Sequence, residues 1–197
     1  MTEDVDHGRR RLLVTATSLT GAVGVVFAAT PFLASWKPSA RAKALGAPVE
    51  IDVSKLELGA MLKVEWRGKP VWVVRRTPEM LKQLDLAQPF LLDPNSDASR
   101  QPAYARNEGR SRKPEYFVVL GVCTHLGCSP MARFQRDDVT VAPDWPGGFY
   151  CPCHGSKFDL AGRVFKGVPA PANLEVPPYV FLSDGRILVG SDTPQAA

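Results

Sequence analysis

The sequence predicts a mostly β head domain that is carried on one N-terminal membrane helix by a flexible tether. Residues 12–33 form an apolar stretch without a charged side chain, and a membrane-spanning helix needs about 20 such residues. From residue 49 onward, short apolar or alternating runs are separated by turn-forming residues, as in antiparallel sheets. The 197 residues suffice for one such domain and a short extra segment.

The N-terminal segment, residues 1–36, is predicted to be a signal and membrane anchor. Three arginines at 9–11 precede the apolar stretch, and Trp36 follows it as an aromatic anchor for the membrane interface. The start also resembles a twin-arginine export signal, in which Gly8 stands where Ser or Thr is usual. We therefore expect a single-pass protein of the bacterial inner membrane, with a cytoplasmic N-terminus and a periplasmic head.

The alternative for this segment is a signal peptide that is removed after export. Residues 40–42 and 42–44 have the small-x-small spacing of a cleavage site. They lie several residues past the apolar stretch, behind Trp36 and further basic residues. A retained anchor is therefore expected.

Residues 37–48 are predicted to be the hinge or tether between anchor and head. They show no strand alternation and contain little that could be buried. Alanine and lysine permit a helix there, whereas Gly46 and Pro48 break regular structure. The head is expected to occupy residues 49–197.

The first part of the head is predicted to contain strands followed by a short helix. Strands are expected at residues 49–53, 61–66 and 71–74. A turn at 67–70 separates the second strand from the third. Thr77 as cap and Pro78 at the first helical position predict a helix that ends at about Leu84.

The rest of the head is predicted to combine a long loop with further strands. Residues 93–114 are polar and rich in Arg, Asn, Ser and Pro, which indicates a surface loop. The apolar run 116–122 leads the chain to the first cysteine. Residues 179–182 and 186–189 flank Asp184-Gly185, which is a strong hairpin signal.

Cysteine and histidine residues gather in one part of the chain. All four cysteines and two of the three histidines lie between residues 123 and 154. A structural zinc ion would use four of these six side chains and leave two cysteines unexplained. A Rieske centre would place two cysteines on one iron and two histidines on the other. The remaining two cysteines could then form a disulfide outside the cytoplasm.

Two short motifs resemble a known family. Cys-Thr-His-Leu-Gly-Cys at 123–128 and Cys-Pro-Cys-His-Gly-Ser at 151–156 resemble the cluster-binding loops of the Rieske subunit of cytochrome bc complexes, ubiquinol–cytochrome c reductase. The resemblance implies a Rieske-type antiparallel β-sandwich head with a small cluster-binding subdomain at about 121–172. It implies one 2Fe–2S cluster with the ligands Cys123, His125, Cys151 and His154. It also implies a disulfide between Cys128 and Cys153.

The resemblance further implies residues that shield the cluster. Pro169, Ala170 and Pro171 resemble the family's Pro loop, which covers the cluster from a third side. Leu126, between the ligands of the first loop, is expected at the exposed tip near the histidines, where the family packs against cytochrome b. The alternative is that Leu126 is simply a core residue.

Two more positions concern the reduction potential. The family uses the serine of the second loop as a donor to a cluster sulfur, and this residue corresponds to Ser156. It commonly has a tyrosine two residues later, which donates to a ligand cysteine, but Phe158 stands there in this chain. The sequence therefore lacks one donor, which suggests a lowered potential.

The function implied by the resemblance is proton-coupled electron transfer from quinol to a c-type cytochrome within a respiratory or photosynthetic bc complex. His154 is expected to contact the quinol and accept its proton, together with His125. The expected partners are cytochrome b, a c-type cytochrome, quinol and membrane lipid, in a dimeric complex. The chain would act as an enzyme only as part of that complex.

Two alternatives remain from the sequence. One is the small Rieske subunit of a periplasmic oxidase such as arsenite oxidase, although the long insertion at 78–115 is unusual for those shorter proteins. The other is a membrane-anchored module with a structural zinc ion. The formal net charge is only +4, and no dense basic stripe with interleaved aromatic residues is present, so a nucleic-acid partner is not expected.

Overall fold

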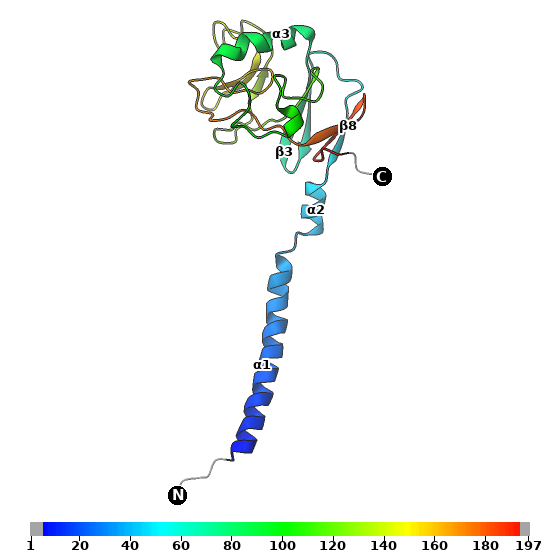
Figure 1. Cartoon of the computed structure of the whole chain (residues 1–197), viewed down its shortest axis with the longest axis vertical. Coiled ribbons are helices and arrows are strands. Elements are labelled where there is room, and N and C mark those ends of the chain that lie inside the picture. The colour runs from blue at the N-terminus through cyan, green and yellow to red at the C-terminus, as the bar shows by residue number, and fades with distance from the viewer. Residues whose placement is uncertain (1–5, 194–197) are drawn as a thin grey trace. The chain divides into compact units, whose positions relative to one another are not determined.

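The computed structural model describes residues 6–193, so residues 1–5 of the predicted signal and residues 194–197 of the predicted head lie outside it. The chain divides into two compact units between Ala44 and Leu45. The predicted boundaries at residues 36 and 48 lie on either side of this division. The first unit is helical, and the second contains all the strands (Figure 1).

Helix α1, His7–Ser35, forms the predicted membrane anchor. It is long and apolar enough to cross a membrane, with a mean hydropathy of 1.9 over its most apolar window, and none of that window is buried by protein. The hydroxyls of Thr20 and Thr30 donate to the carbonyls of Ala16 and Val26 four residues earlier. These polar side chains are therefore satisfied within the helix, as an apolar environment requires.

Part of the predicted tether is helical. Helix α2 covers Ala40–Gly46, and the Ser39 hydroxyl accepts a hydrogen bond from the Ala42 amide at 3.1 Å. The helix ends at Gly46, just before Pro48, in agreement with the expected effect of these two residues. A helix of seven residues is too short to be stable by itself in water.

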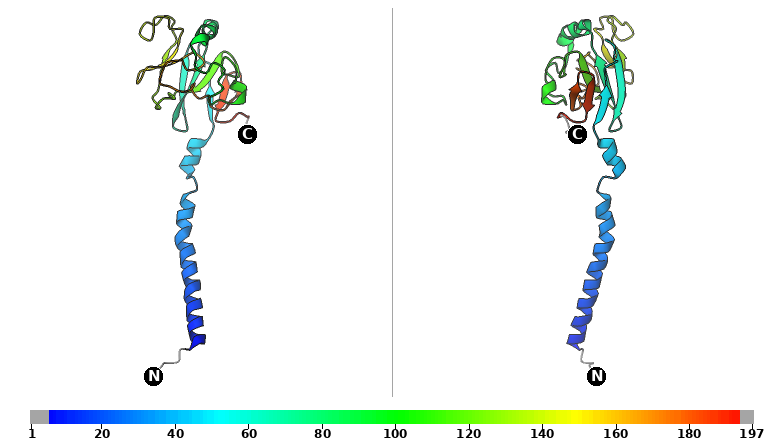
Figure 2. Two further views of the ribbon diagram at one scale, coloured as in Figure 1. Left: turned by 60° about the vertical axis from the view of Figure 1, so that its left-hand side comes forward. Right: turned by 90° about the vertical axis from the view of Figure 1, so that its right-hand side faces the viewer.

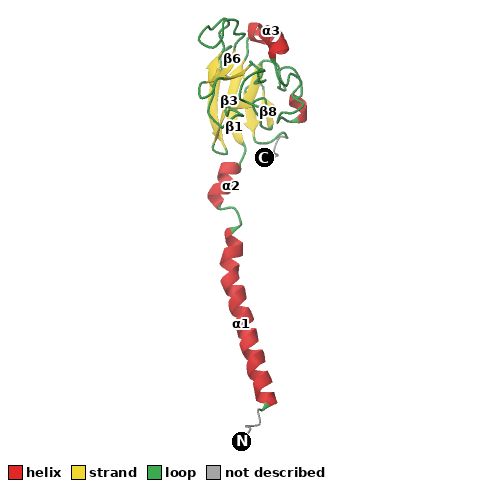
Figure 3. Cartoon of the chain, turned by 90° about the vertical axis from the view of Figure 1, so that its left-hand side faces the viewer, coloured by secondary structure: helices red, strands yellow, loops and turns green. Residues whose placement is uncertain are grey.

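The head contains three antiparallel sheets of three strands each (Figures 2 and 3). The first sheet has the order β1-β9-β8, with β1 Val49–Asp52, β8 Tyr179–Ser183 and β9 Arg186–Val189. The second has the order β2-β3-β4, with β2 Met61–Trp66, β3 Lys69–Arg75 and β4 Tyr116–Leu120. The third has the order β5-β6-β7, with β5 Met131–Arg133, β6 Gly148–Cys151 and β7 Ser156–Phe158.

The first two sheets share one hydrophobic core and thereby form the predicted sandwich (Figure 2). Ile51 and Ile187 of the first sheet belong to the same buried cluster as Val71 and Val73 of the second. Alternation of buried and exposed residues along β1 follows from its position with one face on this core. The predicted hairpin around Asp184-Gly185 is confirmed, because Ser183 pairs with Arg186.

The turn between β2 and β3 is shorter than predicted. Arg67 and Gly68 both have positive φ angles, 52° and 70°, and Trp66 pairs with Lys69 across the turn. A two-residue turn of this kind matches the twist of the flanking strands. Pro70 therefore belongs to strand β3 and pairs with Glu65, and the expectation of a turn through residue 70 was wrong.

Helix α3, Pro78–Ala87, begins where the sequence predicts. The Thr77 hydroxyl accepts a hydrogen bond from the Met80 amide at 3.2 Å. The helix runs three residues past the predicted end at Leu84, because Ala87 continues the buried face of Met80 and Leu84. The short 3₁₀ helix η1, Gln88–Phe90, follows it directly.

The predicted surface loop 93–114 is partly buried. The loop contains the short 3₁₀ helix η2, Ala103–Ala105. It also contains the buried polar residues Ser96, Arg110 and Ser111. Each of them has hydrogen-bond partners inside the head: Nη1 of Arg110, for example, donates to the Leu174 carbonyl at 2.8 Å, although its Nε has no partner. Polar side chains can be buried when they find hydrogen-bond partners inside the protein, and these partners cannot be predicted from composition. The expectation of a surface loop was therefore wrong for these residues.

A tight aromatic contact connects the second sheet to the third. The rings of Trp72 on β3 and Phe149 on β6 stack with their centroids 5.4 Å apart. A Cβ atom on Gly121 would lie 2.1 Å from the Trp72 ring. Glycine is therefore required where the chain leaves β4 and passes against this ring. The contact fixes the position from which the first cysteine-containing loop begins.

Candidate metal centre

Two loops, which follow strands of two different sheets, carry the predicted metal ligands. The first Cys loop, residues 121–130, follows β4, and the second Cys loop, residues 151–156, joins β6 to β7. The Gly127 amide donates to the Cys123 carbonyl at 3.0 Å, and the Gly155 amide donates to the Cys151 carbonyl at 2.9 Å. Both loops therefore contain the same turn, which begins at a cysteine and closes four residues later at a glycine.

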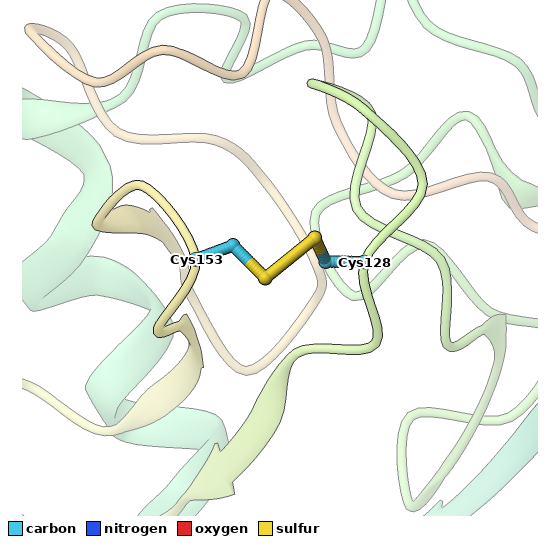
Figure 4. The surroundings of a disulfide bond; sticks show 2 residues. All are labelled: Cys128 and Cys153. Atoms are coloured by element: carbon cyan, nitrogen blue, oxygen red, sulfur yellow. A yellow bond between two sulfur atoms is a disulfide. The ribbon is translucent and has the colours of Figure 1, made fainter.

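A disulfide joins the two loops. Cys128 and Cys153 are bonded, with their Cα atoms 6.8 Å apart, and the view in Figure 4 shows the bridge running from one loop to the other. The predicted disulfide is thus confirmed. Its formation leaves Cys123 and Cys151 as the two remaining cysteines.

These two remaining thiols are buried and lie close to each other. Cys123 and Cys151 are only 3% and 2% exposed. Burial raises the pKa of the Cys151 thiol, and the adjacent Cys123 side chain raises this pKa further. Two buried thiols that are not cross-linked are suited to metal binding, because a coordinated metal ion stabilises the thiolate form that burial otherwise disfavours.

The two histidines of the motifs also meet. The ring centroids of His125 and His154 are 4.8 Å apart, with the rings nearly perpendicular at 89°. His125 is half-buried and His154 is exposed. The loops therefore bring together two buried thiols and a pair of imidazoles that solvent or a partner can reach. This donor set has the composition of a Rieske centre.

A second group of sulfur atoms lies nearby but has a different meaning. The sulfur atoms of Cys128, Cys151 and Cys153 all lie within 4.8 Å of one another. Two of them belong to the disulfide, and a disulfide sulfur lacks the thiolate character of a metal ligand. This group shows how close the bridge lies to Cys151, and it does not form a separate metal site.

A third segment, residues 168–171, which we call the Pro segment, lies beside both loops. The Ala170 amide donates to the Ser156 hydroxyl at 3.1 Å, and the Thr124 hydroxyl donates to the Ala172 carbonyl at 2.6 Å. Ala170 is buried, whereas Pro169 and Pro171 are exposed. Thr124 was missed as a positioning residue, because a threonine between two metal ligands carries no sequence signal of its own.

The remaining predicted site residues differ in exposure. Leu126 is 71% exposed and lies between His125 and Gly127 on the first Cys loop. Ser156 and Phe158 are fully buried. The Ser156 oxygen accepts the hydrogen bond from Ala170, so its own proton is free to be donated elsewhere.

Comparisons with known proteins agree with the chemistry of the site. A family model described as the Ubiquitinol-cytochrome C reductase Fe-S subunit TAT signal matches residues 1–39. A second model, described as the Rieske [2Fe-2S] domain, matches residues 92–179. The second match includes both Cys loops and the Pro segment.

Several similar proteins have the same name. The ubiquinol-cytochrome c reductase iron-sulfur subunit of Allochromatium vinosum is 58% identical over 98% of this chain and 94% of the relative. The protein of that name from Bradyrhizobium diazoefficiens is 43% identical over 94% of this chain and 96% of the relative. A solved structure titled hyperthermophilic respiratory complex III is 26% identical, covering 90% of this chain and 98% of that chain, with a TM-score of 0.47.

These relatives support neither a structural zinc module nor the subunit of a periplasmic oxidase. They match the anchor as well as the head, and they agree with an exported head on a membrane anchor. The chain therefore belongs to the family of ubiquinol–cytochrome c reductase iron–sulfur subunits and carries a Rieske-type 2Fe–2S cluster.

Proposed function

We propose that Cys123 and Cys151 bind one iron of the cluster and that His125 and His154 bind the other. The two cysteines are the buried pair that the disulfide leaves free, and the two imidazoles contact each other at the exposed side of the loops. Ser156 is assigned as a donor to a cluster sulfur, since its proton is not used by the bond from Ala170.

Electron transfer from quinol in a cytochrome bc complex is the function of the family to which the chain belongs. When held by these residues, the 2Fe–2S cluster supplies one-electron chemistry, here between quinol and a c-type cytochrome. The single observation that carries the assignment of the quinol contact is the pair of adjacent imidazoles, one of them exposed.

The proton released by the quinol is accepted by a histidine of this chain. We assign His154 as the quinol contact, because its imidazole is more exposed than that of His125. A ring nitrogen of His154 accepts the hydrogen bond from the quinol hydroxyl and then holds its proton. His125, half-buried beside it, orients this pair and is the second candidate for proton acceptance.

We assign the remaining surfaces to partners. Exposed Leu126 at the tip of the first Cys loop is suited to pack against cytochrome b. Helix α1 contacts membrane lipid, and its arginine-rich N-terminal end stays in the cytoplasm. The head then lies on the periplasmic side of a bacterial inner membrane, within a dimeric complex that also contains a c-type cytochrome.

The function is tested by purifying the complex through a tag on this chain. We expect cytochrome b to co-purify, and we expect dithionite-reduced samples to show the rhombic low-field EPR signal of a Rieske centre. In the same sample, quinol should reduce the oxidised cluster and thereby produce the same EPR signal. A preparation that contained a periplasmic oxidase and no cytochrome b would contradict the proposal.

The tether prediction concerns motion of the head. Prolines placed at Ala42 and Ala44 should break α2 and stiffen the link. Cluster assembly should survive, whereas steady-state quinol oxidation should fall several-fold. The matched control is Arg41→Ala with Lys43→Ala, which keeps a helix-permissive sequence. Unchanged turnover of the proline variant in an assembled complex would argue against a swinging head.

The prediction for Phe158 concerns the reduction potential. Phe158→Tyr should add a donor to the sulfur of a ligand cysteine, and this bond stabilises the more electron-rich reduced state. A difference between redox states of ~1 kcal/mol, a fraction of a hydrogen bond to a charged group, corresponds to a rise of about 40 mV at about 59 mV per tenfold. EPR-monitored redox titration measures it. A potential at or below that of the wild type would show that the ring faces elsewhere.

A further inference from the structure

A buried arginine links the long loop 93–114 to the part of the head that carries the metal site. The Arg110 side chain is fully buried. Its Nη2 donates to the Oε1 of Gln101 at 3.0 Å within the same loop. Its Nη1, in contrast, points to backbone carbonyls more than 50 residues away in the sequence.

Two segments meet at this nitrogen. Nη1 lies 3.2 Å from the carbonyl oxygen of Ala161 and 2.8 Å from that of Leu174. Ala161 follows β7, the strand that begins at Ser156, and Leu174 follows the Pro segment. The backbone also joins them, because the Leu174 amide donates to the Gly162 carbonyl at 2.8 Å. Arg110 therefore donates hydrogen bonds to both segments, next to the backbone bond that joins them.

This junction is closely packed. Gly162 has a positive φ of 68°, and a Cβ atom there would lie 3.0 Å from the Phe117 ring and 3.2 Å from the Leu174 Cβ. Close packing of this kind transmits a displacement of one segment to the other. Such a displacement would change the hydrogen bond from the Ala170 amide to the Ser156 hydroxyl, which joins the Pro segment to the second Cys loop.

We infer that Arg110 is a positioning residue for the metal site, which keeps the Pro segment and the second Cys loop in the register that the Ala170–Ser156 bond requires. Because that bond occupies a lone pair of the Ser156 oxygen, it directs the Ser156 proton away from Ala170. Loss of the register turns the hydroxyl and weakens its donation. The inference rests on the donor role assigned to Ser156 under the proposed function.

The positive charge of Arg110 is a competing explanation for any effect on the cluster. Burial lowers the pKa of Arg110 to about 10, so the guanidinium remains charged at neutral pH. Lysine keeps the charge but lacks the planar fork that reaches Gln101, Ala161 and Leu174 together. Arg110→Lys therefore separates loss of position from loss of charge.

The experiment is a double-mutant cycle in the intact complex, read by EPR-monitored redox titration. Ser156→Ala should lower the potential, because a donor to an electron-rich sulfur is lost. Arg110→Lys should lower the equilibrium constant for reduction about threefold, or ~28 mV at 59 mV per tenfold. In the Ser156→Ala background, Arg110→Lys should cause no further shift. Where Ser156→Ala does lower the potential, additive shifts, or no shift in Arg110→Lys, would overturn the inference.

Two further measurements keep the test decisive. Arg112→Lys is the matched control, because the Arg112 side chain lies over Tyr104 and donates to the Tyr179 carbonyl; its potential should not change. If Ser156→Ala alone shifts nothing, the donor role of Ser156 fails, and hydrogen exchange of the Ala170 amide then decides: faster exchange in Arg110→Lys supports the inference, and unchanged exchange rejects it.

A milder variant covers the case in which Arg110→Lys does not fold. Gln101→Ala removes the side-chain acceptor of Arg110 and leaves the guanidinium in place. We expect a smaller shift in the same direction, again absent in the Ser156→Ala background. A potential that rises in this variant would contradict the inference.

Discussion

Replacement of His125 by alanine will abolish the rhombic low-field EPR signal of the reduced Rieske centre. The side chain is one of two imidazoles whose rings lie 4.8 Å apart at the junction of the two Cys loops, and no other histidine of the described chain lies in this part of the sequence. Alanine leaves one iron with an incomplete ligand set, so the cluster should not assemble. The same loss is expected for Cys123→Ala, Cys151→Ala and His154→Ala.

The controls use residues of the same types outside the ligand set. His7→Ala, in the N-terminal end of α1, should leave the signal unchanged. Cys128→Ser removes a cysteine from the same loop but not a proposed ligand, so the signal should persist, although in a less stable protein. A normal signal in His125→Ala would reject the ligand assignment.

Cys128→Ser is expected to destabilise the head by about 3.5 kcal/mol, the loop-closure term for a cross-link of this span. The bond joins residues that are 25 positions apart in the sequence and belong to different loops. Without it, the two loops can open independently, and solvent gains access to Cys123 and Cys151. Chemical unfolding of the oxidised protein should show the loss, and cluster absorbance should bleach faster in air.

The cross-link can be separated from the side chains by a second cycle. Cys153→Ser alone should cost about as much as Cys128→Ser, and the double variant should cost no more than either single one, because the bond is already absent. Free-thiol labelling of the folded wild-type protein should find neither residue reactive. A double variant that is much less stable than both single variants would show that the thiols contribute beyond the bond.

Much of the fold could be predicted because its signals are local. Strand β2 has the predicted bounds, Met61–Trp66, and α3 begins at the predicted cap, Thr77. The apolar stretch identified helix α1 by its length alone. The predictions failed where contacts between distant segments set the bounds of an element. Helix α3 continues to Ala87 because this residue is also buried against the core. Pro70 lies in a strand because the turn before it needs only two residues.

The cysteines and histidines at the centre of the candidate site could also be predicted from the sequence. The six cysteines and histidines occur in two motifs of six residues each, so the spacing within each loop is fixed by the chain itself. Only the structure, however, brings the two motifs together and leaves Cys123 and Cys151 as the unpaired cysteines. It also adds the Pro segment as a direct hydrogen-bond partner of Ser156.

The anchor, most of the strands, the donor set and the family resemblance could be predicted, because they depend on residue order over short distances. The role of the loop 93–114 depends instead on contacts between segments that are far apart in the sequence. In the sequence Arg110 is one basic residue of a polar stretch, with nothing to mark it as buried. Its carbonyl partners, Ala161 and Leu174, lie 51 and 64 positions away. Such contacts form only when the sheets have already placed these segments side by side, so no local pattern encodes them.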